Sequence, residues 1–139
     1  MLNLPRLQDV DVMPYIREGN AVVIIQDEMA KYTIRYKASK SKDGKVVFIG
    51  YRSGPGYKFK YLCYINKDGW IQLSEKSPLP ANSSIVRMFE EYMENYPNLP
   101  MWMKDYYSNK CGYCGRPLKD PKSQIRGFGP ECSKHIYIF

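Results

Sequence analysis

The chain has 139 residues, of which 44% are hydrophobic, and it carries a formal net charge of +7 with four cysteines and one histidine. This length suits one compact domain, or one domain with a small appendage. No apolar run approaches the roughly 18 residues of a membrane-spanning helix, and the first residues lack the cationic stretch of a secretion signal. We therefore expect a cytoplasmic protein without a membrane segment.

The first two thirds of the chain predict an antiparallel sheet. Residues 1–19 are interrupted by Pro5 and Pro14, so they favour irregular or short helical structure. Residues 21–25 are all apolar and predict a buried strand, and residues 31–39 alternate strictly between apolar and polar side chains. Turn signals at 42–44, 54–56 and 67–69 separate three further strands over 45–52, 57–65 and 70–73. Short turns between successive strands predict a meander.

A helix is expected after the sheet. Residues 82–84 (Asn-Ser-Ser) offer an N-cap for a helix over 85–95. Its apolar side chains have helical spacing and are expected to pack on the sheet: Ile85, Met88, Phe89 and Tyr92. Pro97 and Pro100 then form a short linker, and Met101 to Tyr107 predicts a further helical turn.

The last part of the chain holds a metal-ligand pattern. Cys111 and Cys114 form one C-x-x-C pair, and Cys132 and His135 form a C-x-x-H pair after 17 intervening residues. Such pairs can close a tetrahedral Cys₃His zinc site. A disulfide or scattered free thiols are the alternatives, and an expected cytoplasmic location disfavours the disulfide. Four protein ligands leave no position for a reactive water, so we expect one structural zinc ion.

The residues around these cysteines are similar to those of a small zinc-finger family of unknown function, frequent in bacteriophage and actinobacterial proteins. The resemblance covers only about the last 30 residues and rests on a C-x-x-C-G-R-x-L-x-D-P-x-S pattern followed by G-x-G-P-x-C. The matching residues are Cys111, Cys114, Gly115, Arg116, Leu118, Asp120, Pro121, Ser123, Gly127, Gly129, Pro130 and Cys132. The resemblance implies a zinc module and a phage or mobile-element origin, and it implies no activity. Since the fourth ligand varies in such fingers, His135 rests on its spacing.

The positive charge is concentrated in residues 31–60, where nine basic residues stand against the single acidic residue Asp43, a local charge of +8. Aromatic residues interleave with these charges: Tyr32, Tyr36, Phe48, Tyr51, Tyr57 and Phe59. This pattern is typical of a surface that binds an acidic partner, most commonly nucleic acid. The alternative is a solvated strand face that keeps a small protein soluble. The candidate binding residues are Lys31, Arg35, Lys37, Lys58 and Lys60, with Arg116 and Arg126 in the finger.

No catalytic constellation emerges. Cys63 lies in a predicted strand, and the only histidine is already a candidate zinc ligand, so a Cys–His nucleophile is not expected. A small enzyme with an unseen site is the weakest hypothesis. The sequence thus predicts an α+β protein with no small-molecule substrate: an antiparallel meander with one packed helix over 1–100, and a treble-clef-like zinc finger over 101–139.

Two functions remain open. The first is a non-enzymatic module that binds nucleic acid through the basic, aromatic strands. The second is a phage protein-interaction module that inhibits a host defence or transcription complex, with the basic face docked on an acidic protein surface.

Overall fold

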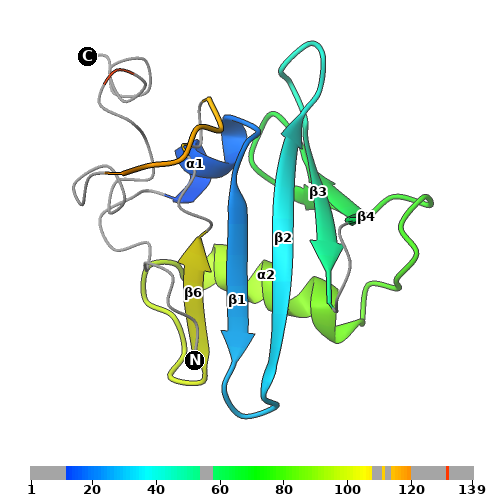
Figure 1. The fold of residues 1–139 in the computed structure, drawn as a ribbon. Helices are drawn as coiled ribbons and strands as arrows, with labels where there is room; N and C mark the ends of the chain where they lie inside the picture. Colours follow the sequence, from blue (N-terminus) through cyan, green and yellow to red (C-terminus); the bar gives the residue numbers. More distant parts are fainter. Residues whose placement is uncertain (1–11, 54–57, 108–110, 112–113, 120–130, 132–139) are drawn as a thin grey trace.

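A computed structural model describes residues 12–53, 58–107, 111, 114–119 and 131. Six strands form one antiparallel sheet in the order β5-β4-β3-β2-β1-β6 (Figure 1). The strands are β1 (Val22–Asp27), β2 (Tyr32–Lys40), β3 (Val47–Arg52), β4 (Lys60–Ile65), β5 (Ile71–Gln72) and β6 (Met103–Tyr107). The helices are α1 (Val12–Arg17) and α2 (Ser84–Asn95). The first five strands follow one another as a meander, so the α+β class and the meander are confirmed.

The apolar–polar alternation of β2 explains how the sheet has one buried and one accessible face. Ile34, Tyr36 and Ala38 are buried in the core, whereas Lys37 and Ser39 are exposed. Successive side chains of a strand point to opposite faces, so the face of the core and the face of the charges are fixed by this alternation. The alternation predicted from residues 31–39 is confirmed.

Helix α2 covers the core face of the sheet (Figure 1). The hydroxyl of Ser83 accepts a hydrogen bond of 3.2 Å from the backbone N–H of Ile85, as an N-cap residue does. Tyr36 of β2 donates its hydroxyl to the carbonyl of Ile85 at 2.7 Å, and its ring lies 4.9 Å from that of Phe89. The predicted helix is confirmed. Its buried stripe contains Val86 beside Met88, Phe89 and Tyr92, while Ile85 is only partly buried.

The helical turn predicted over Met101 to Tyr107 is wrong, because this segment contains β6. Strand β6 pairs with β1, and Asp27 lies opposite Met103 and Ile25 opposite Asp105. Both Met103 and Asp105 are buried, and Lys104 between them pairs with Glu28 at 2.7 Å, so the segment alternates as a strand. The sheet therefore extends beyond residue 100, where the sequence predicts a domain boundary.

Two residues of the predicted finger also belong to the core. Cys111 and Leu118 are buried in the same hydrophobic cluster as the inner residues of β1 to β4 and of α2. The rest of the predicted treble clef, including residues 120–130 and 132–139, lies outside the described residues. Neither described helix is long and apolar enough to cross a membrane.

Candidate functional site

Cations of β2 and β3 lie on the face of the sheet opposite α2, which we call the outer face. Directly paired residues of antiparallel strands share a face. Arg35 pairs with Arg52, Lys37 with Gly50, and Ser39 with Phe48. These six residues alternate with core residues on both strands, so they define the outer face.

The ring of Phe59 lies close to two of the cations on this face, Lys37 and Arg52. A Cβ atom at Gly50 would lie 3.1 Å from the Cβ of Phe59, which is tighter than ordinary contact, so glycine leaves the room that Phe59 fills. The guanidinium carbon of Arg52 lies 5.3 Å from the centroid of the Phe59 ring, and Nζ of Lys37 lies 5.8 Å from it. Cation–π attraction operates within about 6 Å. Phe59 therefore holds two cations of neighbouring strands close together on the outer face.

An open groove of about 750 Å³ lies beside this cluster. We call it the aromatic groove; its walls are formed by Phe48, Tyr61, Tyr64, Leu73, Ser74, Glu75 and Lys76. The rings of Phe48 and Tyr61 meet edge to face with their centroids 6.3 Å apart. The hydroxyl of Ser74 donates a hydrogen bond of 3.1 Å to the hydroxyl of Tyr61. Phe48 remains 43% exposed, so its ring is accessible to a ligand.

A β-bulge in β4 creates the aromatic groove. The pairing register between β3 and β4 shifts between Ile49 and Gly50. Tyr64 pairs with Phe48, and Tyr61 pairs with Gly50, so both tyrosines lie on the outer face although two residues lie between them along the chain. The extra residue of a bulge makes this possible. Sequence reasoning missed Tyr61, Tyr64 and Lys76, because strict alternation places Tyr61 and Tyr64 on opposite faces.

The structure brings together only part of the predicted binding set. Arg35 and Lys37 share the outer face with Arg52, which sequence reasoning counted as charge but did not select. Lys60 pairs with Tyr51, a core residue, so the side chain of Lys60 lies on the core face of the sheet and not on the outer face. Lys31 is exposed in the turn between β1 and β2, and Lys58 is exposed ahead of β4.

The interleaved aromatics also divide between the two faces. Tyr36 and Tyr51 are buried in the core, and Tyr32 packs against it, whereas Phe48 lies on the outer face. Tyr57 lies outside the described residues. The aromatic residues of the segment 31–60 therefore belong partly to the core and only partly to the accessible surface.

The first cysteine pair lies in a tight turn, which we call the cysteine turn (Cys111 to Arg116). The N–H of Cys111 donates to the carbonyl of Arg116, and the N–H of Gly115 donates to the carbonyl of Cys111, both at 2.8 Å. Gly115 has a φ of +78°, a conformation that glycine adopts without a Cβ clash. Cys111 is buried and Cys114 is exposed.

The other two candidate zinc ligands, Cys132 and His135, lie outside the described residues. Within the described part of the chain, no three His, Cys, Asp or Glu residues form a metal-binding group. The bound zinc ion therefore stays a prediction.

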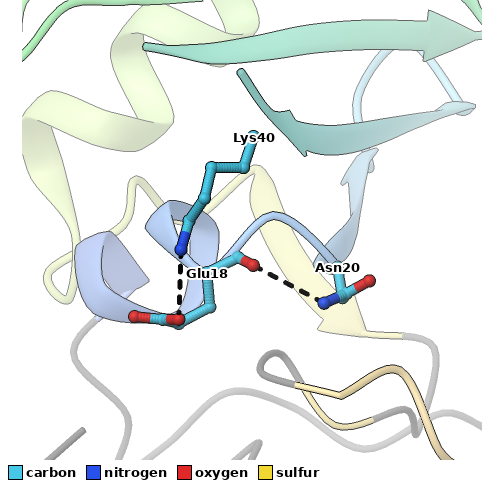
Figure 2. A network of polar contacts seen from close by, with 3 residues as sticks. All are labelled: Glu18, Asn20 and Lys40. Carbon is cyan, nitrogen blue, oxygen red and sulfur yellow. Dashed lines mark hydrogen bonds and ion pairs between the residues drawn. The ribbon is translucent and has the colours of Figure 1, made fainter. Parts of the chain in front are cut away.

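The cysteine turn lies against the loop that joins α1 to β1. A Cβ atom at Gly115 would lie 3.5 Å from Oδ1 of Asn20 in that loop. Asn20 donates from Nδ2 to the carbonyl of Glu18 at 3.5 Å, and the carboxylate of Glu18 pairs with Lys40 at 3.6 Å (Figure 2). The cysteine turn is thus placed next to a loop that is tied to the end of β2.

The cysteine turn and the aromatic groove lie at different parts of the sheet. Arg116 is exposed in the cysteine turn, next to the start of β1, whereas Tyr61 and Tyr64 lie on β4. Strands β1 and β4 are separated by three strand spacings, about 14 Å. Arg126 lies outside the described residues.

Cys63 has the environment of a core residue. It is buried in β4, and its burial, with a smaller effect of the Glu90 carboxylate, raises the pKa of its thiol to about 12. A thiol of this kind carries almost no thiolate at neutral pH, so it is a poor nucleophile. The predicted position of Cys63 within a strand is confirmed.

Comparison with known families assigns no activity to this chain. Residues 105–137 match a family of unknown function, DUF6011. The match begins inside β6 and includes the buried residues Asp105, Cys111 and Leu118, so the matched segment overlaps the sheet and its core. No curated protein and no solved structure matches the chain. The similarity therefore extends to a C-terminal family of unknown function and no further.

Proposed function

We propose that this protein binds nucleic acid without catalysis, through the outer face of its sheet. The observation that carries the proposal is the placement of Lys37 and Arg52 around Phe59, beside an open aromatic groove. Cations supply contacts to phosphates, and exposed rings supply stacking surfaces for bases. Arg35 adds a third cation on the same face.

A charge-neutralising double variant tests this proposal. Lys37→Gln with Arg52→Gln removes two cations of the outer face. A matched control, Lys45→Gln with Lys67→Gln, removes the same charge from two exposed turn residues. Binding of a fluorescein-labelled oligonucleotide is measured by anisotropy as a function of salt concentration.

The salt dependence separates local contacts from net charge. Each phosphate contact on a single strand contributes about 0.7 to the slope of log affinity against log salt. The outer-face variant is expected to weaken binding and to reduce this slope by about 1.4, whereas the control keeps the wild-type slope. Equal losses in both variants would assign the affinity to net charge alone and contradict the proposal.

A chain that binds no oligonucleotide at about 50 mM salt would also refute it, because phosphate contacts are strong at low salt. That outcome would leave the basic face as a surface for an acidic protein. The phage protein-interaction module that inhibits a host complex would then be the better hypothesis.

We also propose one structural zinc ion bound by Cys111, Cys114, Cys132 and His135. The support in the structure comes from the first pair, where Gly115, with a positive φ, follows Cys114 and donates its N–H to the carbonyl of Cys111. Zinc would join this turn to the C-terminal segment and fix Arg116 next to it. Elemental analysis of the purified protein tests the proposal: we expect one zinc per chain, and less than half an equivalent in Cys132→Ser.

A further inference from the structure

The composition of the aromatic groove defines what it can hold. Its apolar wall consists of Phe48, Tyr61, Tyr64 and Leu73, and its polar edge of Ser74, Glu75 and Lys76. Glu75 and Lys76 at this edge carry opposite charges, so the lining has no net charge that would attract a phosphate into the groove. The groove therefore suits a flat group without negative charge, which can lie against an aromatic ring.

The cations next to the groove indicate what such a group is attached to. Phe48 pairs with Ser39, and Lys37 lies two residues from Ser39 on the same face of β2, a rise of about 7 Å. Lys76 lies on the edge of the groove itself. The groove with Lys37 and Lys76 near it would therefore suit a ligand in which a flat, uncharged group has a negative charge on each side. A nucleotide chain has this chemistry, since each base is flanked by phosphates.

We propose that the aromatic groove binds an unstacked nucleobase, so that the protein binds single-stranded in preference to double-stranded nucleic acid. This inference rests on the proposed function and specifies its ligand. In a duplex the faces of the bases are covered by their neighbours, and a shallow groove on a sheet cannot reach them. In a single strand every base offers a free face, and stacking on an aromatic side chain tolerates any sequence.

The test compares three ligands of equal length and label: a 12-nucleotide single strand, the corresponding duplex, and a strand of 12 nucleotides that are all abasic. The abasic strand keeps the phosphates and lacks the bases that would stack. Affinity is measured by fluorescence anisotropy for the wild type, Phe48→Ala and the control Met101→Ala. Met101 is 97% exposed and lies ahead of β6, at the far edge of the sheet from the groove.

We expect Phe48→Ala to weaken binding of the intact single strand roughly 5- to 150-fold, the range found for loss of one base–aromatic stack. It should leave the slope of affinity against salt unchanged, because the ring releases no counterion. It should also leave affinity for the abasic strand unchanged, since that ligand has no base to stack. Met101→Ala is expected to behave as the wild type does with all three ligands.

Two results would overturn the inference while leaving the proposed function intact. One is equal affinity of the wild type for single strand and duplex. The other is an equal loss of affinity for the intact and abasic strands in Phe48→Ala, which would mean that the substitution disturbs the phosphate contacts. Tyr64→Leu, a second variant on the same wall, keeps the test decisive if Phe48→Ala folds poorly. Absence of binding to all three ligands would overturn the inference and the proposed function together.

Discussion

The hydroxyl of Tyr92 donates a hydrogen bond of 2.9 Å to Oδ2 of Asp105, and both residues are buried. This bond joins the C-terminal third of α2 to the edge strand β6, across a segment that contains the linker prolines. Asp105 is 2% exposed, and it is the only charged residue among the buried side chains in the described part of the chain. A buried carboxylate needs hydrogen-bond donors to offset the loss of water, so this pair fixes where β6 lies against the helix.

Tyr92→Phe should therefore destabilise the protein more than loss of a surface hydroxyl does. The substitution removes one donor to a buried charge and keeps the ring in the core. Hydrogen bonds to charged groups contribute about 1.5–3 kcal/mol, and we expect a loss in this range. Urea unfolding measures it, with Tyr64→Phe on the partly exposed outer face as control, for which we expect a change within about 0.5 kcal/mol. Equal stability of the two variants would contradict the importance of the Tyr92–Asp105 bond.

The stability of the protein should fall at alkaline pH. Burial, reinforced by the nearby Asp105 carboxylate, raises the pKa of Tyr92 well above its ordinary value of 10.0, and burial also raises the pKa of Tyr36. Above pH 10 the unfolded chain releases these protons while the folded protein keeps them, so unfolding becomes more favourable as pH rises. The stabilisation is complete below pH 10 and is lost progressively above it.

Urea midpoints between pH 8 and pH 11 test this pH dependence. We expect a decline that begins near pH 10 and is shallower in Tyr92→Phe, which has one fewer tyrosine with a raised pKa. A midpoint that stays constant to pH 11 would show that these tyrosines titrate alike in the folded and unfolded states.

Most of the fold could be predicted from local sequence patterns. Alternation in residues 31–39 and short turns between strands were sufficient for the meander, and the Ser83 cap with its apolar stripe was sufficient for α2. Strand β6 was missed because its core face includes Asp105, a charged residue that hides the alternation of the segment. The hydrogen bond from Tyr92, 13 residues away in the sequence, contributes to making that burial favourable, and no local pattern contains it.

The candidate site was less predictable for the same kind of reason. The alternation of charged residues predicted correctly that Arg35 and Lys37 lie on an accessible face of the sheet. It could not predict that Lys60 lies on the opposite face, because that face is determined by the pairing of Lys60 with Tyr51. The aromatic groove depends on the bulge in β4, which breaks the alternation that sequence reasoning relies on. The relation of the cysteine turn to Asn20 is a tertiary contact with no sequence signal.

The cysteines should differ sharply in reactivity. Cys63 is 1% exposed with a pKa raised to about 12 by burial, so at pH 8 only about one thiol in ten thousand is ionised. Cys114 is exposed in the cysteine turn. With N-ethylmaleimide at pH 8, we expect Cys63 to stay unmodified in the folded protein, and Cys114 to react only after a chelator has removed the proposed zinc ion. Peptide mass spectrometry resolves the two sites.

Two outcomes would contradict these expectations separately. Modification of Cys63 at the rate of Cys114 would mean that the core around β4 opens readily. Rapid modification of Cys114 without a chelator would mean that this thiol holds no metal, and the zinc proposal would fail. Denatured protein, in which every thiol is accessible, provides the reference rate.

Removal of the proposed zinc should also destabilise the sheet, because Cys111, the first residue of the cysteine turn, is buried in the core. Cys111 and Leu118 are buried with the inner residues of the strands, and Gly115 lies against the loop of Asn20. Metal binding to cysteine thiolates contributes to folding, and a change of about 1 kcal/mol shifts the unfolding midpoint of a domain of this size by roughly 2–8 °C.

Thermal unfolding is followed by circular dichroism of the sheet. We therefore expect a chelator to lower the midpoint of a single cooperative unfolding transition. A finger that folds independently would instead lose a separate, smaller transition of its own. Cys132→Ser, which lacks one proposed ligand, should show the lowered midpoint from the start and no further response to the chelator. If the sheet unfolds at the same temperature with and without chelator while zinc is released, the finger and the sheet are independent units, and the burial of Cys111 and Leu118 does not couple them.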